Sequence, residues 1–272
     1  MLEKTHLLLT MQQFIDLKSY PLDQPRSDRY AALVNQCQQE MKREGMFNLQ
    51  GFVNTEGCNE AVAEIAPLMN HQSFTHRRAH NIYFEKDVPG LPPDHPALQL
   101  VETVNHTVCA DQLQQTVIMY IYEYAPLRRF LADVMDKAAL YLMDDPLARA
   151  NVMAYRQGEA LNWHFDRSEF TTTLLLQAPE AGGEFQYRKD LRADNDPNYD
   201  GVARLLMADD DQTRSMSMPA GTLNVFLGKN TAHRVTPVEG NIERMVAVLS
   251  YYEKPGRLFT VDERIGFYGR AT

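Results

Sequence analysis

The sequence has few cysteines and no closely spaced pair of them. Cys37, Cys58 and Cys109 are widely separated, and no Cys-x-x-Cys motif is present. Such a set indicates neither a disulfide framework nor a zinc knuckle. The cysteines therefore favour a reducing compartment.

The chain also lacks a long apolar run and an excess of positive charge. No stretch approaches the roughly 20 apolar residues that span a bilayer. The apolar run in residues 1–10 is too short for a signal-peptide core and carries Glu3 where a basic region should stand. The net charge of -9 and the pI near 5.4 disfavour a nucleic-acid partner, because phosphate binding needs a basic face. We expect a cytoplasmic protein with a small-molecule substrate and neither nucleic acid nor membrane as a partner.

The length and composition are those of one globular unit. With 272 residues, of which 44% are hydrophobic, the chain can bury a sizeable core. It contains no internal repeat and no low-complexity segment. We expect a single domain over 1–272, with a mainly helical part at 1–145 and the strand-rich core at 146–272.

In the first part, apolar residues recur mainly at helical spacing. Residues Gly45 to Val53 alternate in polarity like a short strand, and Pro89, Pro92, Pro93 and Pro96 mark an irregular segment. The predicted helices are Ser27–Glu44, Asn59–Met69 and Leu127–Met143.

After Pro146 the pattern changes to short apolar or β-branched runs separated by turn residues. Such strands with no helices between them are typical of a β-sandwich or jelly roll. A polar insertion at Lys189–Ser215 is a candidate lid, and its Asp209-Asp-Asp sequence is typical of a solvated loop. The predicted strands are Asn151–Tyr155, Phe170–Leu176, Gly183–Tyr187, Gly221–Phe226 and Met245–Tyr251.

Three residues of this second part form a candidate metal site. His164 and Asp166 alternate along a strand and so point to the same face. This pair alone is a weak motif, but His233 adds a second imidazole within a strand–turn–strand pattern. Two imidazoles and one carboxylate form the facial triad of non-haem iron oxygenases, which leaves coordination positions open. Zinc, which prefers a nearly closed tetrahedral site, fits this set less specifically.

Arg244 is a candidate anion anchor. It begins the run Met245-Val-Ala-Val-Leu, which is predicted to be a strand of the same core. A guanidinium inside an apolar barrel needs an anion, and a bidentate pair with the distal carboxylate of 2-oxoglutarate would supply it. An internal Arg–Asp or Arg–Glu pair is the alternative.

Together, His164-Phe-Asp166, His233 and Arg244 resemble the iron(II) and 2-oxoglutarate-dependent dioxygenase superfamily. Its pattern is His-x-Asp, a distal His and an Arg roughly ten residues later, and all four residues match here. The resemblance covers about 151–254. It implies an α+β fold with a double-stranded β-helix, or jelly-roll, core and with N-terminal and flanking helices. It also implies Fe(II), 2-oxoglutarate and O2 as cofactors and cosubstrates.

Two segments, Phe74–Phe84 and the ten residues from His164, resemble a bacterial subgroup of free-amino-acid hydroxylases and radical halogenases. In its halogenases a small residue replaces the carboxylate ligand. Because Asp166 is present, the resemblance implies hydroxylation of an unactivated carbon in a free amino acid or derivative. The reaction would proceed through a ferryl species and release succinate and CO2.

Further residues are candidates for contacts within this site. Tyr155, ahead of the triad, could donate a hydrogen bond to 2-oxoglutarate. Asn162 shares the strand face of the first two ligands, and Ser250 shares that of Arg244. Trp163, with the opposite parity, is predicted to pack against a helix.

The segment before the irregular prolines offers polar contacts to substrate. Arg77, Arg78 and Asn81 are the candidates there, with a solvated turn as the alternative. Arg167, beside the triad, is a further candidate and disfavours a lysine substrate. His76 and His80 stand four apart and could share a helix face, but no third metal ligand lies at an obvious distance.

Two other functions fit parts of this pattern. A cupin-like jelly-roll isomerase or hydrolase could use the same three ligands without an oxo acid, but it would not need Arg244. A non-catalytic binding module would not need the complete ligand set.

Overall fold

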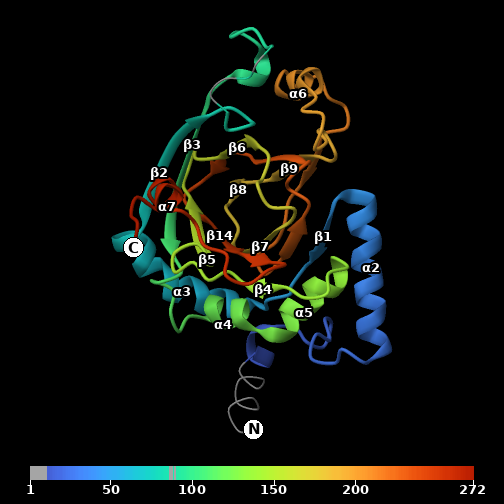
Figure 1. Cartoon of the computed structure of the whole chain (residues 1–272). Coiled ribbons are helices and arrows are strands. Elements are labelled where there is room, and N and C mark those ends of the chain that lie inside the picture. The colour runs from blue at the N-terminus through green and yellow to red at the C-terminus, as the bar shows by residue number, and fades with distance from the viewer. Residues whose placement is uncertain (1–10, 86–87, 89) are drawn as a thin grey trace.

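The computed structural model describes residues 11–85, 88 and 90–272. The apolar run at residues 1–10 and Pro89 lie outside them. Two antiparallel sheets, one of seven strands and one of four, face each other and form a jelly roll (Figure 1). The predicted fold class, an α+β protein with a double-stranded β-helix core and flanking helices, is confirmed.

Strands from both halves of the chain build the larger sheet. Its spatial order is β1-β11-β7-β14-β5-β3-β2. In that order the strands are Met46–Leu49, Leu223–Phe226, Thr171–Gln177, Arg244–Leu249, Ala150–Tyr155, Val101–Cys109 and Phe74–His80.

The smaller sheet has the order β10-β9-β12-β6, and β13-β8 and β15-β4 form two separate two-stranded sheets. All five strands predicted from the sequence are present, with small differences in their bounds. The smaller-sheet strands are Arg214–Met216, Phe185–Arg188, Ala232–Val235 and Leu161–His164; the pairs are Val238–Glu239 with Ala181–Gly182 and Tyr251–Tyr252 with Tyr141–Leu142.

Helices cover the outer face of the larger sheet (Figure 1). Helix α2 begins after Ser27, whose side chain accepts a hydrogen bond from the Tyr30 amide, and ends at Gly45 in the left-handed conformation. The helices are α2 (Asp28–Glu44), α3 (Thr55–Gln72), α4 (Val117–Glu123), α5 (Ala125–Val134), α6 (Tyr199–Leu206) and α7 (Val261–Tyr268), with a short 3₁₀ helix η1 at Pro96–Leu98.

The predicted helix Leu127–Met143 was too long at its C-terminal end. Helix α5 stops at Val134, and Asp136 adopts a positive φ of 53° that an α-helix cannot contain. The Lys137 amide then donates to the Ala132 carbonyl, which closes the last turn. Apolar spacing beyond this point reflects packing of a turn and of strand β4.

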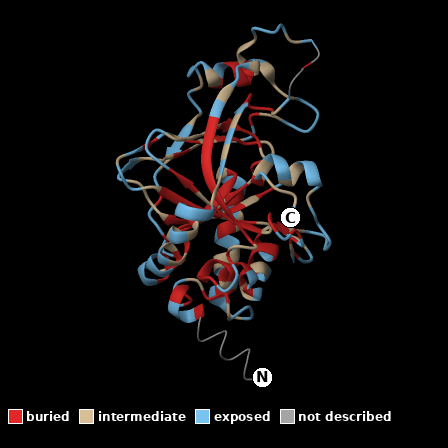
Figure 2. Cartoon of the chain, turned by 90° about the vertical axis from the view of Figure 1, so that its left-hand side faces the viewer, coloured by how far each residue is buried: buried red, intermediate tan, exposed pale blue. Residues whose placement is uncertain are grey.

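Two hydrophobic clusters lie on opposite faces of the larger sheet. One fills the space between this sheet and the helices and includes Ala154, Leu174 and Ala247. The other lies between the two sheets and includes Leu175 and Val246. Figure 2 shows that buried residues gather along the central strands and on parts of the helices. Alternate residues of one strand therefore serve two separate cores.

The insertion at 189–215 is not only a solvated loop. It contains helix α6, whose Val202 and Leu205 are buried in a cluster with Trp163. Packing of Trp163 against a helix is thereby confirmed. Asp210, in the expected solvated stretch, pairs with Arg188 at 3.0 Å and its side chain is only 7% exposed. No helix in the described ranges is long and apolar enough to cross a membrane.

Candidate metal centre

Strand pairing brings the two predicted histidine ligands together. His164 ends β6 and His233 lies on β12, and the two are directly opposite each other in the antiparallel register. Their ring centroids are 4.1 Å apart. Asp166 follows β6, and ligand atoms of the three residues all lie within 4.8 Å of one another. Within the described ranges this is the one such cluster of histidine, cysteine and carboxylate side chains.

Both imidazoles direct the same nitrogen to the shared centre. Nε2 of His164 and Nε2 of His233 each lie 3.5 Å from Asp166 Oδ1. On the other side of each ring, Nδ1 lies 2.8 Å from the Asn162 carbonyl and 3.0 Å from the Thr231 carbonyl, respectively. A carbonyl only accepts, so Nδ1 carries the proton in both rings. Each Nε2 therefore keeps a lone pair for a metal.

The charges suit a divalent cation. Burial lowers the pKa of His164, and the neighbouring His233 adds to this effect, so the ring is neutral near pH 7. Burial alone would raise the pKa of Asp166, but the two histidines outweigh it and hold that pKa well below the ordinary value. The ligand set is thus one carboxylate and imidazole nitrogens, which fits a facial iron site.

Aromatic rings surround the centre. Phe226 and Phe185 lie with ring centroids 4.7 and 5.8 Å from that of His233, and Phe84 lies 6.0 Å from that of His164. These rings keep the ligand side chains buried, with His164 7% and His233 3% exposed. An apolar surrounding strengthens the electrostatic interactions at the metal position.

Arg244 is buried without a carboxylate partner among the described residues. It is the first residue of β14 and is 4% exposed, and its Nε donates to the Gly183 carbonyl at 3.2 Å. Burial lowers the pKa of its guanidinium, and only the Tyr155 side chain opposes this effect. The alternative of an internal Arg–Asp or Arg–Glu pair is not observed. A buried guanidinium of this kind is a candidate anion-binding group.

Tyr155 is the cross-strand partner of Arg244. The Arg244 guanidinium carbon lies 6.0 Å from the tyrosine ring centroid. The hydroxyl donates a hydrogen bond to the Met153 sulfur at 3.8 Å, and burial raises the pKa of Tyr155 to about 12. The phenol therefore stays protonated and available as a donor next to Arg244.

Asn162 has a different placement from that of Tyr155. Its side-chain Nδ2 donates to the Glu102 carbonyl at 2.5 Å, and its backbone N–H donates to Thr103 at 3.3 Å. It thereby ties β6 of the smaller sheet to β3 of the larger one. Contact with the cosubstrate stays a prediction for this residue.

Arg78 faces the space between the two sheets. Met153 packs on the inter-sheet cluster, and its cross-strand partner Thr107 shares that face. Four residues along β3, Thr103 faces the same way and pairs with Arg78 of β2. The Arg78 guanidinium lies 5.1 Å from the ring centroid of Phe84, the same ring that neighbours His164.

Asn81 supports the turn that carries Phe84. Its Oδ1 accepts from the Tyr83 and Glu85 amides, and its Nδ2 donates to the Glu85 carbonyl. Both polar atoms of the amide are therefore engaged within the turn. Phe84 has a φ of 57°, which an aromatic residue adopts only when its surroundings fix it.

Arg167 and Ser250 also contact protein groups. Arg167 is exposed, pairs with Glu263 of α7 at 2.7 Å, and lies 5.5 Å from the Phe267 ring centroid. The Ser250 hydroxyl donates to the Ala148 carbonyl at 3.2 Å. Ser250 shares the face of Arg244 but stands at the opposite end of β14, about 20 Å along the strand. The alternation of side chains along a strand predicts the sheet face of Ser250 correctly but does not predict its position along the strand.

His76 and His80 lie on strand β2 and not on a helix. The His76 ring stacks on Phe267, with centroids 6.4 Å apart. Both nitrogens of His80 are engaged, Nε2 by Thr103 at 2.9 Å and Nδ1 by the Asn81 carbonyl at 2.9 Å. A spacing of four residues is compatible with one strand face as well as one helix face.

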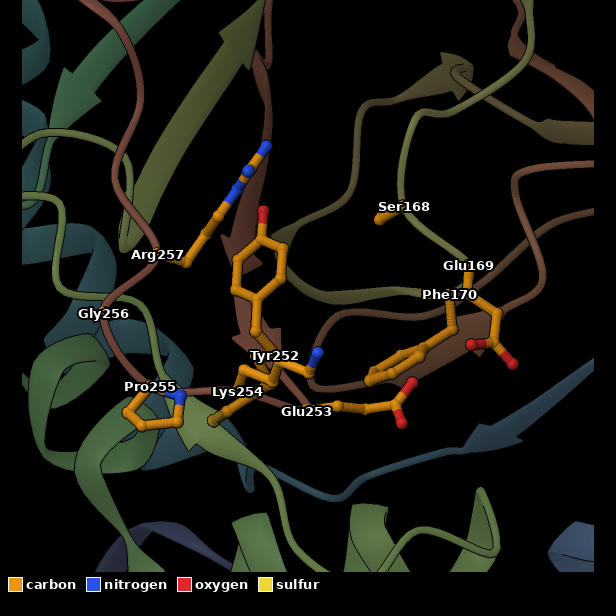
Figure 3. Close-up of a pocket in the computed structure, with 10 residues that line it drawn as sticks. Ser168, Glu169, Phe170, Tyr252, Glu253, Lys254, Pro255, Gly256 and Arg257 are labelled. Carbon is orange, nitrogen blue, oxygen red and sulfur yellow. The ribbon is translucent and has the colours of Figure 1, made fainter.

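A pocket of about 450 Å³ opens at the rim of the barrel (Figure 3). It is bounded by residues 168–170, which follow Asp166, and by 251–257, which follow β14. Lys137 joins the two segments, since it pairs with Glu169 at 3.1 Å and with Glu253 at 3.0 Å. None of the metal ligands lines this pocket, so it is separate from the metal centre.

The sequence model of the Halogenase D family matches residues 30–256. This range is most of the chain and contains the three ligands and Arg244. The chain belongs to this family. The predicted relationship to the iron(II) and 2-oxoglutarate-dependent oxygenases is thereby confirmed. None of the curated proteins compared with the chain matches it.

Solved structures share the fold of this Halogenase D family member. The non-haem α-ketoglutarate-dependent epimerase SnoN from nogalamycin biosynthesis matches with a TM-score of 0.52 and 13% identity, over 81% of each chain. A prolyl hydroxylase from Trichoplax adhaerens matches with a TM-score of 0.51 and 11% identity, over 82% of this chain and 90% of its own. A second SnoN structure contains Fe³⁺ and α-ketoglutarate and matches with a TM-score of 0.50 and 12% identity, over 81% of this chain and 84% of its own. At such identities these matches establish the fold alone.

Two residues that touch the Asp166 carboxylate, Thr171 and Gly228, were not predicted from the sequence. The Thr171 hydroxyl donates to Asp166 Oδ2 at 2.5 Å. A Cβ atom on Gly228 would lie 2.1 Å from the same oxygen. The only sequence signal was the run Phe170-Thr-Thr-Thr, whose three hydroxyls are indistinguishable before the register is known.

Proposed function

We propose that this protein hydroxylates an unactivated carbon of a small molecule, an amino acid or derivative, with Fe(II), 2-oxoglutarate and O2. His164, Asp166 and His233 would hold the metal, which when bound supplies oxygen activation coupled to decarboxylation of the oxo acid. The observation that carries the proposal is Arg244, buried with no carboxylate partner in the described ranges of the same inter-sheet space.

Each protein group has a separate task in this reaction. The Arg244 guanidinium would bind the distal carboxylate of 2-oxoglutarate, and the protonated Tyr155 hydroxyl beside it would donate a second hydrogen bond. The rings of Phe84, Phe185 and Phe226 would exclude water from the reacting groups. Orientation of the substrate is then the remaining requirement.

Arg78 is the proposed contact for an anionic group of the substrate. It faces the inter-sheet space, and its guanidinium lies over a ring that in turn neighbours His164. A substrate carboxylate bound there would place the adjoining carbons toward the metal. This arrangement supports an amino acid or derivative as the substrate class.

Halogenation is the second candidate reaction, and the family match favours it. Halogenases of the group that the sequence resembles carry a small residue in place of the carboxylate ligand. Asp166 is present here, and its Oδ1 lies at equal distance from both histidine nitrogens. The carboxylate thus occupies the position that a halide would need, and this supports hydroxylation.

The decisive experiment is an anaerobic titration of the iron(II)-loaded protein with 2-oxoglutarate. Bidentate chelation of iron by the oxo acid gives a weak visible charge-transfer band. If the band appears, amino acids are screened for substrate-dependent succinate formation with and without chloride, and mass spectrometry distinguishes hydroxylated from chlorinated product. If folded, iron-bound protein gives no band, the oxygenase proposal fails and the cupin-like metalloenzyme replaces it.

A further inference from the structure

The two oxygens of the Asp166 carboxylate have different surroundings. Oδ1 faces the two histidine nitrogens at 3.5 Å each. Oδ2 faces away from them, where it accepts the hydrogen bond from the Thr171 hydroxyl and contacts Gly228. Because an ionised carboxylate only accepts, the hydroxyl is the donor in this bond.

The sheet fixes both groups that hold Oδ2. Thr171 is the first residue of β7 and pairs with Phe226, the last residue of β11. Gly228 lies two residues beyond Phe226, and its carbonyl accepts the Asp166 amide at 2.9 Å. The loop that bears Asp166 is therefore attached at its backbone and at its side chain to the end of the β7–β11 pair.

Gly228 leaves space that any other residue would fill. A Cβ atom there would lie 2.1 Å from Asp166 Oδ2 and 2.7 Å from its Cγ, both far below a normal contact distance. Alanine at this position would thus displace the carboxylate. The same space lets the carboxylate turn so that one oxygen meets Thr171 and the other meets the histidines.

We propose that Thr171 is a positioning residue that, with Gly228, restrains Asp166 to bind the metal through Oδ1 alone. A free carboxylate can coordinate through one oxygen or two, and two would occupy a further position on the metal. With Oδ2 held by the hydroxyl, three protein atoms ligate and the remaining positions stay open for cosubstrate and oxygen. The inference rests on the proposed function and specifies how its ligand set is kept.

The test compares Thr171→Val with wild type. Valine keeps the shape and removes the hydroxyl, so Fe(II) affinity, measured anaerobically by competition with a chromogenic chelator, should fall about 10- to 100-fold. The visible band formed with 2-oxoglutarate should also shift or weaken. Thr171→Ser should restore both properties, because it restores the donor.

Thr172→Val is the matched control. Thr172 is the next residue of β7, faces the opposite side of the sheet, and its buried hydroxyl has no partner among the described residues. Its replacement should leave Fe(II) affinity and the band unchanged. Gly228→Ala is the second variant, and it should weaken Fe(II) binding at least as much as Thr171→Val while the metal-free protein still unfolds cooperatively.

The outcomes separate this inference from the proposed function. If wild type gives the 2-oxoglutarate band and Thr171→Val binds Fe(II) and forms the band as wild type does, the positioning role is refuted while the function stands. Wild-type Fe(II) affinity in Gly228→Ala likewise refutes it. If no variant gives the band but Fe(II) affinity still depends on the Thr171 hydroxyl, the positioning role stands and the proposed function fails.

Discussion

Replacing Arg244 should stabilise the ligand-free protein and abolish its response to 2-oxoglutarate. The guanidinium is 4% exposed, and its Nε donates a hydrogen bond to the Gly183 carbonyl. Removing one partner of a buried ion pair lowers the free energy of unfolding by roughly 3–5 kcal/mol, because the other charge is left unpaired. Arg244 leaves no such partner within the described ranges, so Arg244→Met should not incur that cost.

The magnitude follows from two opposing effects on the free energy of unfolding. The variant loses one hydrogen bond, which contributes about 1 kcal/mol, and no longer desolvates a charge, which costs several kcal/mol. We expect a net gain of roughly 1–4 kcal/mol without ligand. Two charge-assisted hydrogen bonds to a carboxylate contribute about 1.5–3 kcal/mol each. Their loss corresponds to a decrease in 2-oxoglutarate affinity of more than about 100-fold.

Thermal unfolding with and without 2-oxoglutarate, under anaerobic conditions with Fe(II), measures both effects. At a ligand concentration of about 100 times Kd, wild type should gain roughly 2.7 kcal/mol, whereas Arg244→Met should gain almost nothing. Arg188→Met is the control, since Arg188 forms an ion pair with Asp210 at 3.0 Å. Its replacement should lower stability without changing the response to 2-oxoglutarate. A strongly destabilised Arg244→Met that keeps the full 2-oxoglutarate response would refute the reasoning.

Three further outcomes are expected. Arg78→Gln should raise the substrate KM at least about tenfold with little change in Tm. The control Arg77→Gln loses only an exposed ion pair with Glu102 and should leave KM unchanged. Equal KM values for the two variants would contradict the substrate contact. Asp166→Gly should abolish hydroxylation, measured as hydroxylated product, and wild-type turnover in that variant would exclude Asp166 as a ligand. Burial alone would raise the pKa of Asp145, but three backbone N–H groups and Arg264 hold this pKa below the ordinary value. The Asp145 carboxylate therefore stabilises the fold at pH values above its unfolded pKa, and that stability is lost as pH falls through the folded pKa. Asp145→Asn should therefore lower stability by about 3 kcal/mol at neutral pH and flatten the acid limb of a Tm-versus-pH curve; an unchanged limb would contradict this.

The metal ligands were predictable because their chemistry restricts them. The spacing of His164 and Asp166 pointed to two ligands on one face, although β6 ends at His164 and Asp166 lies just beyond it. Few functions also need a second histidine and an arginine on later strands. Helix α2 was predictable because its cap residues and its apolar spacing agree. In both cases the signal lies within a short stretch of sequence.

Features that depend on strand register could not be predicted. The histidines of β2 fit a helix or a strand equally well, and only pairing with β3 decides between them. Thr171 was indistinguishable from Thr172 until β7 was placed between β11 and β14. Gly228 resembles an ordinary turn glycine, and its closeness to Asp166 comes from a contact between segments far apart in the sequence.

The position of β14 has a consequence for how the protein is made. Of the strands in the described residues, only the two-residue β15 follows β14 in the chain, yet β14 lies in the middle of the larger sheet between β7 and β5. Until residue 249 has left the ribosome, the nascent sheet consists of two groups of strands, each with an unpaired edge that can pair wrongly. Closure of the larger sheet and placement of Arg244 beside Tyr155 therefore occur together, after the six other strands of this sheet have been synthesised. A chain released before this point would present aggregation-prone edges and not a smaller working enzyme.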